Sequence, residues 1–257
     1  MKKSNYSISF YQAQSIGSQN SAKQIVPLLI DLISPKSIVD VGCGIGTWLS
    51  VFRYHGIDKV VGIDGDYVNK EMLLIPKECF IPHDLTQPLS LKEKFDLVIS
   101  LEVAEHLPAR FASSFVDNLI KLGPVVVFSA AIPFQGGVAH VNEQWPEYWV
   151  ELFKKQNYVV IDCLRNKLWN NTKIKPWYAQ NMMIFVDEQY LPNYQKLVRE
   201  RFPNDELVVY TRIHPQIWIN AHQFHQQSLR KILKVLPLLI ENKLRRTLLK
   251  VFTYINK

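Results

Sequence analysis

Cysteine is scarce in this sequence, and the cysteines that occur do not form pairs. The 257 residues include three, Cys43, Cys79 and Cys163, at wide spacings and without a CxxC motif. An odd, scattered set argues against a fold built on disulfides. It favours a reducing, cytosolic compartment with buried or inert thiols.

Long hydrophobic runs are also missing. Residues 1–10 contain two lysines but no apolar segment behind them, so we expect no signal peptide. The apolar run VLPLLI at 235–240 is far too short to span a bilayer. With no internal repeat and an ordinary hydrophobic fraction of 47%, the chain is expected to form one large globular domain, alone or with an appendage.

Excess charge is absent from most of the chain and gathers at its end. Residues 225–257 hold eight Lys or Arg and one acid, whereas the other residues carry 22 basic and 22 acidic side chains. Within 229–256, apolar residues recur at helical spacing with cations between them, and Pro237 interrupts the pattern. This predicts a basic amphipathic helix, either packed on the main domain or lying on a membrane surface that contains anionic lipid. Nucleic-acid contact is the least favoured alternative, because no aromatic-interleaved RNA motif accompanies the charge.

The middle of the chain alternates strand patterns with helical patterns. Seven apolar runs read as strands, at 37–41, 59–63, 79–82, 95–101, 124–130, 158–164 and 181–186. Continuous Val and Ile rather than strict alternation indicates strands buried on both faces, hence a mostly parallel sheet. Helical patterns fit between them at 47–55, 108–122 and 145–156, which predicts a doubly wound α/β fold. We expect a helical lead-in over 1–35 that ends in a helix at 21–33, a main domain over 36–186, and a helical C-terminal extension over 187–257.

A glycine-rich turn follows the first predicted strand. In SIVDVGCGIGTW the acid Asp40 precedes Gly42, Gly44 and Gly46 at a spacing of two residues. This is one residue shorter than the G-x-G-x-x-G fingerprint of dinucleotide-binding proteins, which leaves an NAD site or a purely structural tight turn as alternatives.

Two later strand ends carry acids suited to a nucleoside. The strand KVVGI ends in Asp64 and Gly65, about 20 residues after the turn, where a carboxylate can accept both ribose hydroxyls. The next strand ends in His83-Asp84-Leu85, where a carboxylate beside an apolar residue can hold an adenine amino group.

These stretches together resemble the class I S-adenosylmethionine-dependent methyltransferases. The matching segments are DVGCGIG, GIDG, PHDL and FDLVISLEVAEHL, in that order, within residues 36–186. The resemblance implies a seven-stranded Rossmann-like fold that binds S-adenosylmethionine. The implied cofactor-binding residues are Asp40, Gly42, Gly44, Gly46, Asp64, Gly65, Asp84, Leu85, Leu101 and Glu102. The chemistry agrees, because free amides at the turn suit the cofactor's carboxylate, while Asp40 can hold the loop or meet its ammonium group.

The segment EVAEH adds a cluster of polar side chains after the fourth strand. If it turns helically, Glu102, Glu105 and His106 lie at positions i, i+3 and i+4 and share a face. Two carboxylates and an imidazole at a cleft predict either general acid–base chemistry or a divalent metal such as Mg²⁺.

Residues 129–149, SAAIPFQGGVAHVNEQWPEYW, follow the fifth strand, where such folds place the acceptor pocket. Gly136 and Gly137 make the passage flexible. Its polar groups are His140, Asn142, Glu143 and Gln144, and its aromatic residues are Trp145, Tyr148 and Trp149. The aromatic residues either wall a pocket for a sugar ring or belong to the core.

The spacing Glu-x-x-Glu-His with a distal histidine resembles two metal-linked groups of methyltransferases. These are the magnesium-dependent small-RNA 3′-terminal 2′-O-methyltransferases and the ubiquinone-pathway O-methyltransferases. The resemblance implies a metal held by Glu102, Glu105, His106 and His140, although metal-free relatives also carry such a stretch. With the later RNKLWNN and WYAQN, the passage also resembles a bacterial branch linked to cell-surface polysaccharide.

The sequence therefore predicts a cytoplasmic S-adenosylmethionine-dependent methyltransferase that acts on a hydroxyl of a sugar, glycan or other small molecule. The expected catalytic residues are Glu105, His106, His140 and Glu143, with His106 or His140 as the general base oriented by Glu105. An RNA ribose 2′-O-methyltransferase is the main alternative, disfavoured by the neutral catalytic domain. A non-catalytic cofactor-binding module is the second alternative.

Any peripheral membrane contact is expected to be made by residues 229–256.

Overall fold

The protein, described by a computed structural model over residues 8–201 and 209–222, is an α/β fold around one mixed sheet. The chain divides into two units, the first ending at His214 and the second beginning at Pro215. The strands are β1 (Ser37–Val41), β2 (Lys59–Asp64), β3 (Phe80–Pro82), β4 (Leu97–Leu101), β5 (Val125–Ser129), β6 (Tyr158–Ile161) and β7 (Met183–Asp187). All seven lie where the sequence predicts strands.

The sheet has the strand order β3-β2-β1-β4-β5-β7-β6. Every pairing is parallel except those of β7, which runs antiparallel to both β5 and β6. Strands β1, β4 and β5 are buried along their whole length, as their continuous Val and Ile runs predict. The predicted doubly wound, mostly parallel sheet is confirmed.

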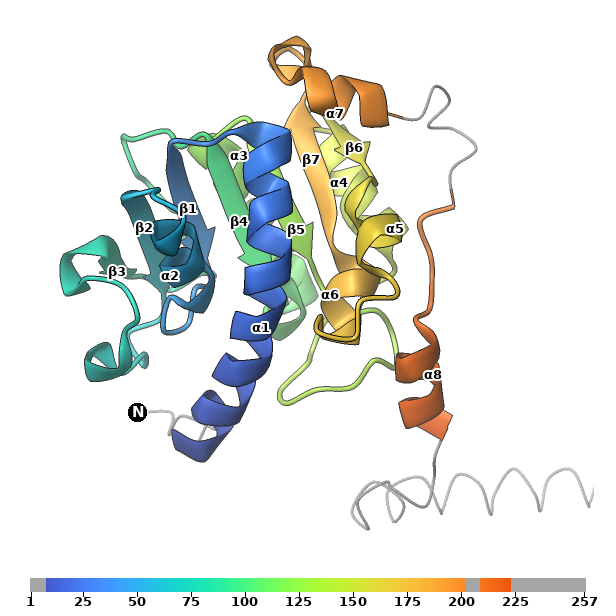
Figure 1. Ribbon diagram of the computed structural model, residues 1–257, viewed down its shortest axis with the longest axis horizontal. Coiled ribbons are helices and arrows are strands. Elements are labelled where there is room, and N and C mark those ends of the chain that lie inside the picture. The colour runs from blue at the N-terminus through green and yellow to red at the C-terminus, as the bar shows by residue number, and fades with distance from the viewer. Residues whose placement is uncertain (1–7, 202–208, 223–257) are drawn as a thin grey trace, which may run out of the picture. The chain divides into compact units, whose positions relative to one another are not determined.

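Helices cover both faces of the sheet (Figure 1). They are α1 (Ile8–Ile33), α2 (Thr47–Tyr54), α3 (Ala112–Leu122), α4 (Pro146–Lys154), α5 (Leu164–Leu168), α6 (Pro176–Asn181) and α7 (Gln195–Glu200), with α8 (Pro215–His222) in the second unit. The buried residues form two clusters, one beneath α1, α2, α5, α6 and α7 and the other beneath α3 and α4. In the second cluster the rings of Phe153 and Phe185 stack with their centroids 3.9 Å apart.

The lead-in and the extension differ from their expected boundaries. Helix α1 begins at Ile8 rather than near residue 21, and it packs on the sheet through Ile25, Val26 and Leu29, which are fully buried. The first unit continues to His214, so residues 187–214 belong with the sheet rather than with a separate tail. The basic stretch 229–256 lies outside the described residues. Within the described residues, no helix has both the length and the apolar character that crossing a membrane requires.

The thiols agree with the expectation of inert cysteines. All three are free, and Cys43 and Cys163 are buried. Burial raises the pKa of Cys163 to about 12. Burial, followed by the charges of Asp40 and Asp64, raises the pKa of Cys43 well above its ordinary value.

Candidate functional site

Two adjoining cavities open at the carboxyl ends of the parallel strands, where the strand order reverses between β1 and β4. The larger, which we call the main cavity, has a volume of about 770 Å³. The smaller, the side cavity, has a volume of about 570 Å³. Tyr67, Leu85 and Leu107 line both, so the two form one continuous region of the surface. Each falls in the size range of small-molecule sites.

The glycine turn after β1 borders the main cavity. Gly42 and Gly44 both line it, with φ angles of 87° and 55° that favour glycine. A Cβ atom at Gly42 would lie 2.3 Å from a methyl group of Val103, whereas the space beside Gly44 is open. A ligand can therefore approach the backbone closely at Gly44. Gly46 does not line either cavity and instead precedes the first residue of α2.

Asp64 ties the end of β2 to this turn. Its carboxylate accepts hydrogen bonds from the backbone amides of Gly44 and Gly65, each 2.7 Å long, and from the Tyr67 hydroxyl. Burial raises the pKa of Asp64, and these three hydrogen bonds oppose that rise. Asp64, the predicted ribose-binding acid, therefore lines the main cavity, and one of its oxygens accepts a hydrogen bond from Tyr67.

The predicted adenine-binding pair lies in the side cavity. Asp84 and Leu85 line it together with Gly65. Asp84 Oδ1 accepts hydrogen bonds from the Thr86 amide (2.9 Å) and hydroxyl (2.7 Å), which lower the pKa of this exposed carboxyl. The carboxylate is therefore fixed and ionised at the mouth of the cavity.

Asp40 lies deeper, beneath the turn. Its side chain is 3% exposed but lines the main cavity. Burial, followed by the charge of Asp64, raises the pKa of Asp40 well above its ordinary value. A cationic ligand group beside it would favour its ionised form.

Glu102 follows β4 on the other side of the same cavity, next to Leu101, which also lines it. Its backbone has φ 57°, and its amide donates to the Ser129 carbonyl over 2.9 Å. Its carboxylate accepts hydrogen bonds from Gln135 (2.9 Å) and Asn181 (3.1 Å). Burial raises the pKa of Glu102, and the bonds from Asn181 and Gln135 oppose the rise.

Glu105, His106 and His140 come together against the main cavity. Their potential ligand atoms all lie within 4.8 Å of one another, and the two imidazole rings are 4.9 Å apart, edge to face. The loop that carries His140 is held there by the amides of Val141 and Asn142, which donate to the Glu105 carbonyl.

The Glu105 and His106 side chains are unusual in their lack of partners. Among the residues that the structure describes, no hydrogen-bond partner meets either carboxylate oxygen of the fully buried Glu105 or the buried Nδ1 of His106. Burial and the charge of Glu102 raise the pKa of Glu105 well above its ordinary value. Burial, then the charge of His140, lowers the pKa of His106, so its ring is neutral at neutral pH.

The general base expected from the sequence is oriented differently from the prediction. Glu105 makes no side-chain hydrogen bond to either histidine, whereas Glu143 Oε1 lies 2.9 Å from His140 Nδ1. Glu143 is itself fixed by the amides of Phe134 (2.8 Å) and Gly136 (3.1 Å). Glu143 rather than Glu105 therefore orients the imidazole.

The expected aromatic wall is also different. Trp149 is 2% exposed and packs on Phe128 in the core, and neither it nor Trp145 lines a cavity. Apart from Tyr67 and the two histidines, the aromatic residues that line the main cavity come instead from α2 and α6. They are Trp48, Trp177 and Tyr178, accompanied by Ser18 and Lys175. Trp48 ends the glycine-turn stretch, and Trp177 and Tyr178 begin the stretch WYAQN; no role for any of the three was predicted from the sequence.

Known proteins resemble this chain in sequence and in fold. A family model described as a methyltransferase domain matches residues 12–171. The ubiquinone biosynthesis O-methyltransferase of Rhodopseudomonas palustris (strain BisB18) is 27% identical over 131 residues, which cover 46% of this chain and 45% of that protein. The match thus spans less than half of the relative's length.

Solved structures share the fold. SAM-bound CalS10, an amino pentose methyltransferase from Micromonospora echinaspora, matches with a TM-score of 0.52 and 12% identity, over 73% of this chain and 99% of that one. The methyltransferase domain of bacterial CtHen1 matches with a TM-score of 0.49 and 20% identity, over 66% and 97%.

The family match covers more than half of the chain, and its range contains the glycine turn, Asp64, Asp84 and the Glu105–His106–His140 group. The chain therefore belongs to the methyltransferase-domain family, and residues 12–171 lie within a class I S-adenosylmethionine-dependent methyltransferase domain.

Proposed function

We propose that this protein transfers the methyl group of S-adenosylmethionine to a hydroxyl oxygen of a sugar, glycan or similar small molecule, with His140 as the general base. The observation that carries the proposal is the His140–Glu143 pair beside the cavity that the glycine turn borders. The O-methyltransferase relative supports oxygen as the acceptor atom.

The donor would span both cavities. Open backbone at Gly44 suits the cofactor's carboxylate, and Asp40 and Glu102 suit its ammonium group. Asp64 would meet the ribose, and Asp84 with Leu85 the adenine. The sulfonium, which joins the amino-acid end to the ribose, would then lie between the glycine turn and Asp64.

The reaction is an in-line displacement at the methyl carbon. The acceptor oxygen forms a bond to the methyl group as the carbon–sulfur bond breaks, the sulfur keeps the electron pair, and the hydroxyl proton passes to His140. A hydrogen bond from Nδ1–H to Glu143 leaves Nε2 as the proton acceptor. Holding donor and acceptor at attack distance supplies most of the remaining acceleration.

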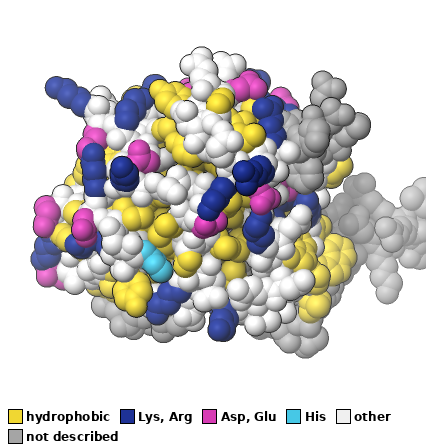
Figure 2. Space-filling model, turned by 45° about the horizontal axis from the view of Figure 1, so that its top comes forward, with side chains coloured by type: hydrophobic (Ala, Val, Ile, Leu, Met, Phe, Trp, Pro, Cys, Tyr) yellow, Lys and Arg dark blue, Asp and Glu magenta, His cyan; other side chains and the backbone are white. Residues whose placement is uncertain are grey.

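The wall made by Trp48, Trp177 and Tyr178 favours an acceptor with a flat or partly apolar ring, such as a sugar. Figure 2 shows Lys and Arg interspersed with Asp and Glu on one face of the molecule. Outside residues 225–257 the chain carries 22 basic and 22 acidic side chains, and this balance gives no support to an RNA acceptor, which a basic track would favour.

A divalent metal fits the residues present. The buried, unpartnered oxygens of Glu105 and Nδ1 of His106 lie with His140 in one group, and oxygen with imidazole nitrogen suits Mg²⁺ or a borderline divalent ion. Glu102, predicted as a fourth ligand, is outside this group because its carboxylate is held by Gln135 and Asn181. With such an ion bound, His140 would be a ligand rather than the base, and the ion would instead lower the pKa of the acceptor hydroxyl.

The test is methyl transfer from labelled S-adenosylmethionine by the full-length protein to a panel of monosaccharides and glycans. We expect incorporation into a hydroxyl-bearing acceptor. We expect His140→Ala to abolish turnover while leaving the affinity for S-adenosylhomocysteine near that of the wild type. Loss of cofactor affinity in that variant, or unchanged turnover, would contradict the assigned role.

A further inference from the structure

Glu102 is held in an unusual backbone conformation. It is a non-glycine residue whose φ angle of 57° lies in the left-handed region. It directly follows the end of β4 and lines the main cavity. Such a conformation is unfavourable for a residue with a Cβ atom and persists only where the surroundings enforce it. Here the Ser129 carbonyl and hydroxyl both accept from the Glu102 amide, at 2.9 and 3.2 Å.

Two amide side chains hold the carboxylate. Asn181 Nδ2 donates to one oxygen and Gln135 Nε2 to the other, so both oxygens are engaged. Gln135 comes from the loop that carries His140, and Asn181 ends α6. One carboxylate thus joins the acceptor-side loop to the helix beside β7.

The orientation of these amides is set from outside the site. The backbone N–H of His214, which can only donate, meets Gln180 Oε1 at 2.8 Å. The Gln180 amino group must therefore face the other way, where it donates to Gln135 Oε1 (3.1 Å) and Asn181 Oδ1 (2.9 Å). With their oxygens so engaged, Asn181 and Gln135 present N–H groups to Glu102.

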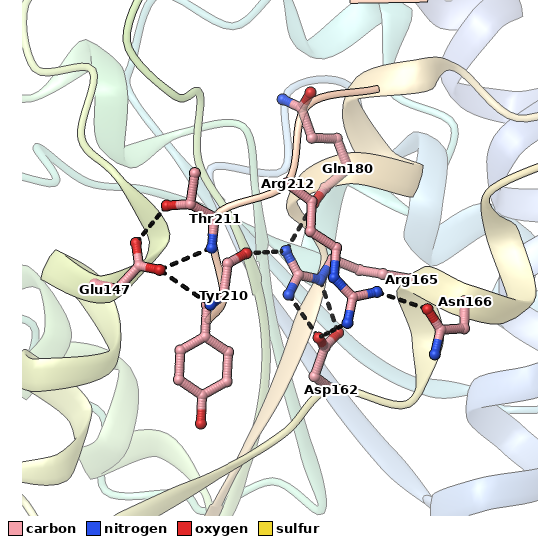
Figure 3. A network of polar contacts seen from close by, with 8 residues as sticks. All are labelled: Glu147, Asp162, Arg165, Asn166, Gln180, Tyr210, Thr211 and Arg212. Atoms are coloured by element: carbon pink, nitrogen blue, oxygen red, sulfur yellow. Dashed lines mark hydrogen bonds and ion pairs between the residues drawn. The ribbon is translucent and has the colours of Figure 1, made fainter. Parts of the chain in front are cut away.

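His214 belongs to residues 209–214, which we call the strap. Figure 3 shows the contacts that hold Tyr210, Thr211 and Arg212 of the strap in place. Glu147 accepts hydrogen bonds from the amides of Tyr210 (3.0 Å) and Thr211 (2.7 Å). The fully buried Arg165 donates through Nη1 to the carbonyls of Tyr210 (2.6 Å) and Gln180 (3.3 Å) and is paired with Asp162. The strap and the end of α6 are therefore bound to the same guanidinium.

We propose that Asn181 and Gln135, aligned by Gln180 and the strap, are positioning residues that aim Glu102 at the ammonium group of the bound cofactor. The inference rests on the proposed function, because it takes the glycine turn as the site of the cofactor's amino-acid end. Glu102 and Asp40 line the cavity on either side of that turn and are the carboxylates an ammonium group there would meet.

The test compares two adenosine thioethers that differ only in the presence of the cofactor's amino-acid group. S-adenosylhomocysteine carries the amino-acid group, whereas 5′-methylthioadenosine has a methyl group in its place. Calorimetric titration of full-length Asn181→Leu with both is expected to show an affinity about 10- to 100-fold lower for S-adenosylhomocysteine, since a hydrogen bond to a charged group is lost, and unchanged affinity for 5′-methylthioadenosine. The KM for S-adenosylmethionine should rise likewise, with kcat at saturation little altered.

Two further variants separate positioning from folding. Gln135→Leu lies on a loop and should give a smaller loss confined to S-adenosylhomocysteine. Asn118→Leu removes an equally buried asparagine that bonds residues 87 and 89, so it should weaken both ligands equally or neither.

The outcomes are distinct. Equal losses for both ligands in Asn181→Leu and Gln135→Leu, or no loss in either, would overturn the inference. Failure of the wild-type protein to bind S-adenosylhomocysteine would instead overturn the proposed function.

Discussion

At the scale of single residues, the site depends on carboxyl groups placed in contrasting surroundings. Asp84 is exposed, held by Thr86 and has a lowered pKa. Asp40 and Glu105 are buried, and the pKa of each is raised. The exposed acid is therefore ionised before the ligand arrives, whereas the buried acids gain charge only when a cation or metal compensates them.

Asp40 makes the unliganded protein sensitive to pH. Because its folded-state pKa is raised above the unfolded value, its contribution to stability is fully present below the unfolded pKa and is lost as pH rises through the folded pKa. Asp40→Asn removes this loss. We expect the variant to unfold at a higher temperature than the wild type at pH 8, with a smaller difference at pH 4, in thermal scans without cofactor. A variant that is less stable at pH 8 would contradict the burial cost assigned to Asp40.

Glu143 should affect the chemical step and not cofactor binding. Glu143→Gln cannot accept from both the Phe134 and Gly136 amides while keeping His140 in place. We expect kcat to fall by about 10- to 100-fold with S-adenosylhomocysteine affinity unchanged, measured by steady-state kinetics and calorimetry. The control is Glu151→Gln, an exposed acid on α4, which should behave as the wild type. Equal rates for the two variants would rule out the His140–Glu143 pair.

At the scale of elements, the long apolar strands were predictable and the short helices were not. Strands β1, β4 and β5 are mostly apolar runs rich in Val and Ile, which is typical of strands buried on both faces. Helices α5 and α6 have five and six residues, too few for a periodic pattern to emerge. Their stability comes from tertiary contacts, above all those of Arg165, which no local pattern reveals.

The Arg165–Asp162 pair tests this view of the elements. Both side chains are fully buried and joined by two hydrogen bonds. Arg165→Met removes two hydrogen bonds from the buried Asp162 carboxylate and leaves it the longer ion pair with Arg212 (3.3 Å), so we expect it to lower the free energy of unfolding by about 3 kcal/mol in urea titrations. Adding Asp162→Leu should recover part of the loss. If the free energy of unfolding of Arg165→Met lay within about 1 kcal/mol of the wild-type value, the pair would not be what holds α5 and the strap.

At the scale of the whole molecule, the grouping of the acids was predictable because it follows from strand order. Parallel strands end at one edge, so acids at the ends of β1, β2 and β4 gather there. The partners of those acids could not be predicted. Asn181 lies 79 residues from Glu102, and the strap reaches Gln180 across 34 residues, separations that no spacing rule connects.

The basic stretch 229–256 carries the remaining prediction at this scale. If its cations face a membrane, full-length protein should sediment with liposomes that contain anionic lipid, and protein ending at residue 224 should not. Vesicles of neutral lipid are the control. Equal sedimentation of the two proteins would contradict a membrane role for this stretch.

The most direct test of the central claim is a crystal structure of the protein with S-adenosylhomocysteine. The account predicts the amino-acid end against Gly42 and Gly44, the ribose hydroxyls on Asp64, and the adenine beside Asp84. A ligand bound elsewhere, or with its amino-acid end away from the glycine turn, would contradict it.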